Sequence, residues 1–165
     1  MKIKGKVLLR VYPDDIRRGI FIVPENIKEI APGAISFLPS LQMLLFSSNV
    51  EKIGNSAITN NPFLKIVHIT PSVKEIGSLA FSYCNNLRKI EIPVNVQKVG
   101  DGAFFGCTSL ENIEIANENI QIGKHTFEFC PAVKKVKIPR KLNSKNLISL
   151  ETPDAKIIFT EDLQK

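Results

Sequence analysis

The chain has 165 residues, of which 44% are hydrophobic and 23% are charged, a composition typical of one globular domain. This length needs neither disulfides nor a metal for stability, and no apolar stretch approaches the roughly 20 residues that span a bilayer. The net charge of +6 is concentrated between Lys124 and Lys145, where seven basic residues accompany one acid.

The first nineteen residues predict an extended segment followed by a turn. Lys2, Lys4 and Lys6 alternate with apolar residues, which favours a strand from Lys2 to Val11 over the continuous apolar core of a secretory signal. The polar run Tyr12–Asp15 then predicts a turn.

From residue 20 to residue 139 the sequence repeats with a spacing of 23 residues, in five full copies and part of a sixth. Several apolar columns share this spacing, for example Ala34, Ala57, Ala80 and Ala103; Phe81, Phe104 and Phe127; and Leu41, Leu64, Leu87 and Leu110. Such a period is the signature of a solenoid, in which each repeat forms one rung and buries its apolar face against its neighbours.

Each repeat predicts the same order of elements. It opens with a short strand, because two apolar positions separated by one residue, such as Ile90 and Ile92, point to one face of a sheet. A second extended segment follows and ends at a glycine such as Gly100, where a bend without a Cβ is permitted. Ala80, Phe81 and Cys84 then fit one face of a single helical turn.

The open ends of a solenoid require caps. We therefore expect residues 1–165 to form one domain, with residues 1–19 as an N-terminal cap and residues 140–165 as a C-terminal cap. A closing strand is predicted over 156–160, reached through the polar stretch 142–154.

The third and fourth repeats carry a family resemblance. The run Ile90-Glu91-Ile92-Pro93, the pair Val99-Gly100, the pair Ala103-Phe104, and then Cys107 and Leu110 resemble the leucine-rich repeat of the BspA-like, Treponema-type class. The resemblance implies an α/β fold, a right-handed solenoid with a parallel concave sheet and short helical turns, and a role in protein and surface recognition without catalysis.

No arrangement of residues indicates an active site, a cofactor or a metal. Cys84, Cys107 and Cys130 occupy one repeat column, which predicts small buried side chains and lacks the tetrahedral geometry of a zinc site. His68 and His125 lie more than two repeats apart, and neither belongs to a nucleophile set. The glycines are spaced by repeats and do not form a phosphate loop. We therefore expect a protein that is not an enzyme.

Two columns of charge alternate in opposite phase along the repeats. One runs Glu29, Lys52, Glu75 and Lys98, and the other runs Lys28, Glu51, Lys74 and Gln97. In a parallel stack each acid would face a base above and below, so we expect these columns to fix the register of the repeats.

The residues expected to point outward from the first strand of each repeat change from apolar to charged midway along the chain. The apolar part and its border are predicted to bind a partner protein, and comprise Ile20, Ile22, Met43, Leu45, Ile66, His68 and Glu91. Two alternatives remain open, since a second copy of the chain or the N-terminal cap could cover the same surface.

A second candidate site is the basic end, where Lys135, Lys137, Arg140 and Lys141 could hold an anionic polymer such as nucleic acid or an acidic polysaccharide. Few aromatic residues interleave with them, which favours a solvated end over a nucleic-acid site. Three unpaired thiols favour a reducing, cytoplasmic compartment, whereas a cell-surface location would follow if the chain were part of a larger protein.

Overall fold

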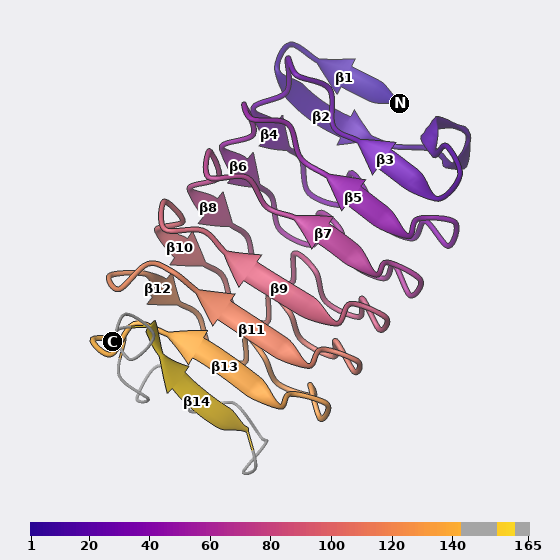
Figure 1. Cartoon of the computed structure of the whole chain (residues 1–165). Helices are drawn as coiled ribbons and strands as arrows, with labels where there is room; N and C mark the ends of the chain where they lie inside the picture. The colour runs from indigo at the N-terminus through magenta and orange to yellow at the C-terminus, as the bar shows by residue number, and fades with distance from the viewer. Residues whose placement is uncertain (143–154, 161–165) are drawn as a thin grey trace.

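A computed structural model describes residues 1–142 and 155–160. Within them the chain is a parallel β-solenoid in which each turn takes 23 residues from Ile20 to Ile138 (Figure 1). The polar stretch predicted before the last strand lies almost entirely outside the described residues.

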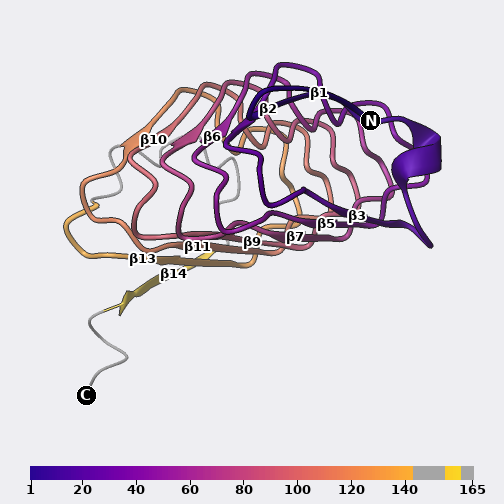
Figure 2. The same cartoon turned by 90° about the horizontal axis from the view of Figure 1, so that it is seen from above.

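Two strand layers form two sides of the stack (Figure 2). The short-strand face comprises β1 (Lys2–Lys4), β2 (Val7–Arg10), β4 (Glu29–Ile30), β6 (Lys52–Ile53), β8 (Glu75–Ile76), β10 (Lys98–Val99) and β12 (Gln121–Ile122). The long-strand face comprises β3 (Ile20–Ile22), β5 (Met43–Leu45), β7 (Ile66–His68), β9 (Lys89–Ile92), β11 (Asn112–Ile115), β13 (Lys135–Ile138) and β14 (Lys156–Phe159).

The N-terminal segment differs from its prediction. The single strand expected over Lys2–Val11 is wrong, because β1 and β2 form an antiparallel hairpin that turns at Gly5, whose φ is +59°. The hairpin pairs with β4 and so extends the short-strand sheet. The polar turn that follows contains the 3-10 helix η1 (Pro13–Asp15).

The third side of the stack is a turn face, formed by the segments 33–37, 56–60, 79–83, 102–106 and 125–129. The amides there alternate between two acceptors: Ser82 N–H donates to the Leu79 carbonyl of its own rung, and Phe81 N–H donates to the Ala103 carbonyl of the next rung. Leu79 and Tyr83 both have positive φ, which interrupts any α-helix.

This geometry stands in place of the helical turn predicted from the spacing of Ala80, Phe81 and Cys84. No α-helix occurs among the described residues, so neither the α/β class nor the short helical turns is confirmed. The reason is that the turn-face amides which bond the next rung cannot also bond the carbonyl four residues back, as an α-helix requires.

The repeat columns form the core, as the spacing predicts. Ala80, Ala103 and Leu110 are fully buried, and the rings of Phe81, Phe104 and Phe127 stack with centroids 5.2 and 5.4 Å apart. The glycines after the second strand have a role beyond the predicted bend. A Cβ on Gly100 would lie 2.4 Å from the Ser78 backbone nitrogen, so this residue permits the close approach of adjacent rungs.

Candidate functional site

The predicted apolar residues lie together on the first three rungs of the long-strand face. Parallel pairing places Ile20, Met43 and Ile66 in one row, and Ile22, Leu45 and His68 in the next row. The five apolar residues of these rows are called the apolar patch below. Ile22 is 62% exposed and Ile66 is 49% exposed, while Met43 and Leu45 are half-buried.

The N-terminal cap does not cover the apolar patch. The β1–β2 hairpin joins the short-strand sheet through β4, and Ile22 of β3 keeps more than half of its surface exposed. The alternative in which the cap folds over these rungs is therefore wrong.

The border of the patch coincides with a break in strand pairing. The structure pairs β3 with β5 and β7, and separately pairs β9 with β11, β13 and β14, but it does not pair β7 with β9. A groove of about 220 Å³ lies at this break, lined by Lys65, Ile66, Val67, Lys89 and Glu91.

The two predicted border residues differ in their contacts. His68 is exposed on β7. Glu91 forms an ion pair with Lys89 of the same strand, and the hydrogen bond from Lys89 to this carboxylate raises the pKa of the lysine. The carboxylate of Glu91 is therefore already partnered, which leaves the apolar side chains as the distinguishing chemistry of this surface.

At the basic end, carboxylates of the preceding rung neutralise two of the four predicted cations. Lys137 Nζ lies 2.6 Å from Glu114 Oε1, and Lys141 Nζ lies 3.1 Å from Glu118 Oε1. The Arg140 guanidinium lies over the Phe159 ring, 4.5 Å from its centroid. Lys135 has no carboxylate within ion-pair distance among the described residues.

The three cysteines are buried hydrogen-bond donors. Cys84 Sγ donates to the Ile58 carbonyl at 3.4 Å, and Cys107 Sγ donates to the Phe81 carbonyl at 3.2 Å. Asn61 precedes them in the column and donates to the Ile35 carbonyl in the same way. Burial raises the pKa of Cys84 and Cys130 to about 12 and raises that of Cys107 well above its usual value, so these thiols are not nucleophiles.

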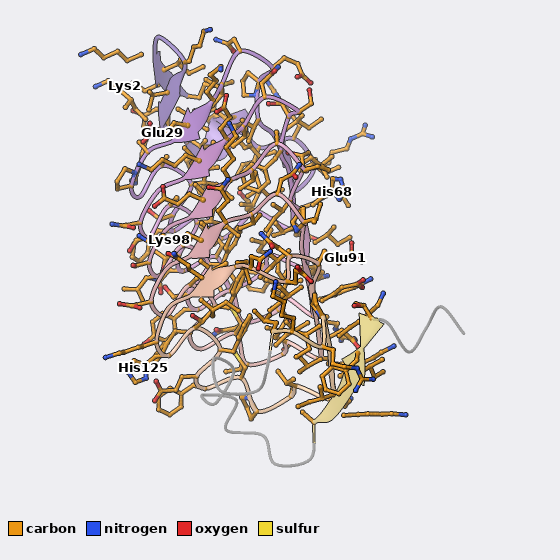
Figure 3. All side chains as sticks on the ribbon, turned by 90° about the vertical axis from the view of Figure 1, so that its left-hand side faces the viewer. Lys2, Glu29, His68, Glu91, Lys98 and His125 are labelled. Atoms are coloured by element: carbon orange, nitrogen blue, oxygen red, sulfur yellow. The ribbon has the colours of Figure 1, made fainter. Side chains whose placement is uncertain are left out.

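The histidines do not share a site. Figure 3 shows His68 on the same side of the molecule as Glu91, with His125 on the opposite side. In the part of the chain that the structure describes, no three histidine, cysteine or acidic side chains are grouped so that they could hold a metal ion.

Sequence reasoning missed an aromatic cluster on the turn face. Phe105 packs edge-to-face against Tyr83 and Phe129, with centroids 5.6 and 5.1 Å away, and Tyr83 and Phe129 are about half exposed. These residues belong to columns that are aromatic in only some repeats. The available signal was the clustering of aromatic residues in the third to fifth copies outside the buried phenylalanine column.

Comparison with known proteins identifies a repeat family. The sequence profile of the BspA type leucine rich repeat region matches six copies, over residues 19–88 and 60–152. No curated protein matches the chain. None of the helices in the described segments is long and apolar enough to cross a membrane.

Solved structures share the fold. The leucine-rich-repeat protein of T. pallidum is 25% identical with a TM-score of 0.68, over 72% of this chain and 58% of its own. A leucine-rich cell surface protein of Faecalibacterium prausnitzii is 26% identical with a TM-score of 0.73, over 79% of this chain and 34% of its own. The pneumococcal vaccine antigen PcpA, at 18% identity, shares the fold with a TM-score of 0.74, over 94% of this chain and 44% of its own. This chain therefore spans less than two thirds of each of these proteins.

Proposed function

Because the chain belongs to the BspA-type leucine-rich-repeat family, whose repeats build binding modules, we propose that it is a non-catalytic protein-interaction module that binds its partner through the apolar patch. The long-strand face that carries the patch corresponds to the sheet that the family resemblance places on the concave side. The partner is another protein, because aliphatic side chains without a polar anchor suit the apolar core of a protein interface.

The observation that carries this proposal is the exposure of Ile20 and Ile22 in the first rung and of Ile66 in the third, with Met43 and Leu45 of the second rung between them. Nothing in the 23-residue period requires apolar side chains there, since the same positions hold Lys89, Asn112 and Lys135 in the next three rungs. A contiguous apolar surface of a few hundred Å² often marks an interaction site. His68 and Glu91 would form part of its polar rim.

A second copy of the chain is the nearest rival occupant of this surface. A homodimer would bury the same side chains against each other, and the symmetry of such an interface places each patch opposite its equivalent. The experiment below separates this possibility from a different partner.

Binding of an anionic polymer at the basic end has less support. Lys137 and Lys141 already pair with Glu114 and Glu118, so a phosphate or sulfate would have to displace these carboxylates. The proposed function therefore does not use this end.

We further propose a cell-surface location, which is supported by the F. prausnitzii relative described as a cell surface protein. The three thiols do not favour a reducing compartment as their number suggested, because each of them is buried and donates a hydrogen bond. Immunolabelling of intact and permeabilised cells would test the location.

The test of the binding site replaces two exposed members of the patch, in the double variant Ile22→Asp with Ile66→Asp. A photo-reactive amino acid at position 45 of the otherwise unchanged protein identifies what contacts the patch in the native cell, and sedimentation of the purified chain measures self-association. We expect the double variant to lose binding of the partner that the cross-link identifies. Its melting temperature should stay within a few degrees of the parent's.

The matched control is Phe37→Asp with Val94→Asp, which adds the same charge at residues that are 66% and 59% exposed outside the patch. It should retain the partner. Equal binding by both double variants would contradict the proposal, and a dimer abolished only by Ile22→Asp with Ile66→Asp would show that the partner is a second copy.

A further inference from the structure

A second surface feature lies on the turn face, away from the apolar patch. It is an open hollow of about 420 Å³ whose lining includes Leu79, Asp101, Gly102, Phe105, His125 and Glu128. Its volume lies within the range of about 300 to 1,000 Å³ that is typical of ligand sites. These residues come from three successive rungs, so the hollow depends on the assembled stack.

The hollow exists because the middle rung lacks a side chain. Leu79, Gly102 and His125 are equivalent positions in successive rungs. A Cβ on Gly102 would lie only 2.8 Å from Leu79 Cδ2, so the leucine extends over the glycine. The φ of Gly102, +59°, is close to that of Leu79, +55°, and of His125, +57°, so the missing side chain and not the backbone sets the middle rung apart.

The apolar wall of the hollow is held in place by neighbouring rings. Phe105 is half-buried and lies edge-to-face between Tyr83 and Phe129, which restricts its motion. Leu79 remains 43% exposed. The leucine and the phenylalanine therefore offer a preformed apolar surface to a ligand.

Two carboxylates supply the charge. Asp101 Oδ1 accepts a hydrogen bond from the Lys124 backbone amide at 2.8 Å, and Glu128 Oε2 lies 2.6 Å from His125 Nδ1. No lysine or arginine side chain is among the described residues that line the hollow. The hollow therefore presents two carboxylates on a chain whose net charge is +6.

We propose that this hollow binds an arginine side chain of a partner protein. A guanidinium group can pack against an aromatic ring and pair with carboxylates, while its methylene stem covers apolar surface. Phe105 supplies the ring, Asp101 and Glu128 supply the carboxylates, and Leu79 supplies the apolar surface. A lysine fits less well, because its compact ammonium lacks the planar fork that binds a carboxylate through two hydrogen bonds. This site is independent of the apolar patch.

The test is an NMR titration of the whole chain with N-acetyl-arginine methylamide, following the backbone amides of Gly102 and Phe105. The citrulline analogue has nearly the same shape without the charge. We expect saturable shifts with arginine, and at least about tenfold weaker binding with citrulline, the change that loss of a charged hydrogen bond produces.

The variant Asp101→Asn with Glu128→Gln removes both charges and keeps the side-chain oxygens that contact Lys124 and His125. It should fold as the parent does and bind arginine at least about tenfold more weakly. The control Glu111→Gln with Glu118→Gln makes the same change in net charge at two other surface carboxylates and should bind normally.

Three outcomes would overturn the proposal. One is the absence of saturable shifts at Gly102 and Phe105, and another is equal binding of arginine and citrulline, which would show a purely apolar hollow. The third is a shift of these amides with protein concentration alone, since a second copy of the chain would then occupy the hollow.

Discussion

The rings of Phe81 and Phe104 lie in adjacent rungs with centroids 5.2 Å apart and planes inclined by only 6°. Phe127 continues the stack at 5.4 Å from Phe104. The repeat thus builds a continuous column of aromatic rings inside the solenoid, with Phe104 in contact with a ring on both sides.

Replacing Phe104 with alanine should destabilise the protein by about 3 to 5 kcal/mol, because it leaves a cavity between two buried rings. Chemical denaturation followed by circular dichroism measures the change. The control Phe37→Ala alters a phenylalanine that is 66% exposed and should change the stability by no more than about 0.5 kcal/mol. Equal effects of the two substitutions would show that the ring column does not dominate the core.

Gly100→Ala should also destabilise the chain, by about 1 to 3 kcal/mol or more. The added methyl group would lie 2.4 Å from the Ser78 backbone nitrogen, and the backbone of the neighbouring rung cannot move without breaking its hydrogen bonds. Thermal unfolding measures the loss.

Gly5→Ala is the matched control, because nothing lies within 4 Å of its added Cβ. The positive φ of Gly5, +59°, should still cost about 1 to 2 kcal/mol. Crystallography of Gly100→Ala should show the third and fourth rungs further apart, a separation that Gly5→Ala does not produce. Unchanged rung spacing in Gly100→Ala would contradict the close-approach explanation.

The charge column Lys28–Glu51–Lys74 forms direct ion pairs. Glu51 Oε1 lies 2.7 Å from Lys28 Nζ, and Oε2 lies 3.0 Å from Lys74 Nζ. The hydrogen bond from Lys28, followed by that from Lys74, lowers the pKa of Glu51 from 4.5 to about 2. The adjacent charge column consists of Glu29, Lys52, Glu75 and Lys98. Its residues are paired in register in successive rungs, as predicted.

Because the folded protein holds this pKa below the unfolded value, the stabilisation by Glu51 is present above about pH 4.5 and is lost as the pH falls towards about 2. An NMR titration of the side-chain carboxyl carbon should show a midpoint near pH 2. In Glu51→Gln the stability should depend less on pH over the same range, and Glu25→Gln is a surface control. A Glu51 midpoint near 4.5 would rule out the paired geometry in solution.

The buried thiols predict a loss of folding stability at high pH, whereas Glu51 predicts a loss at low pH. The folded pKa of Cys84 and Cys130 is raised from 9.0 to about 12, so their contribution to stability is complete below about pH 9 and falls as the pH rises towards 12. We expect iodoacetamide at pH 8 to leave all three thiols of the folded chain unmodified and to label them after denaturation.

Mass spectrometry counts the labelled thiols. Replacing all three cysteines with alanine should reduce the alkaline loss of stability that the parent shows between pH 9 and pH 11. Rapid labelling of a thiol under native conditions would contradict its burial.

The sequence was sufficient for the parts of this structure that depend on repetition. A spacing of 23 residues fixes which residues become neighbours in a parallel stack, so the columns of Phe104 and Ala103 and the register of Glu29 with Lys52 follow directly. The surface position of Ile22 and Ile66 follows from strand alternation in the same way.

The sequence was insufficient where hydrogen-bond choice or single departures from the repeat decide the structure. The segment Leu79–Tyr83 has helix-compatible spacing, yet the amides of Leu79, Phe81 and Tyr83 bond the next rung. The break between β7 and β9 and the hollow at Gly102 depend on the geometry of particular rungs. Periodicity averages over the rungs and therefore cannot reveal such features.

The hydrogen bonds of the turn face also determine how this chain will behave in exchange and spectroscopic measurements. Phe81 N–H and Phe104 N–H donate to the rung beyond at 2.7 and 2.9 Å, and both residues are fully buried although they belong to no strand or helix. Their amides should exchange with solvent as slowly as those of β9 and β11, while far-ultraviolet circular dichroism should show almost no helix. Protection from exchange will therefore extend through residues that a secondary-structure assignment classifies as turns.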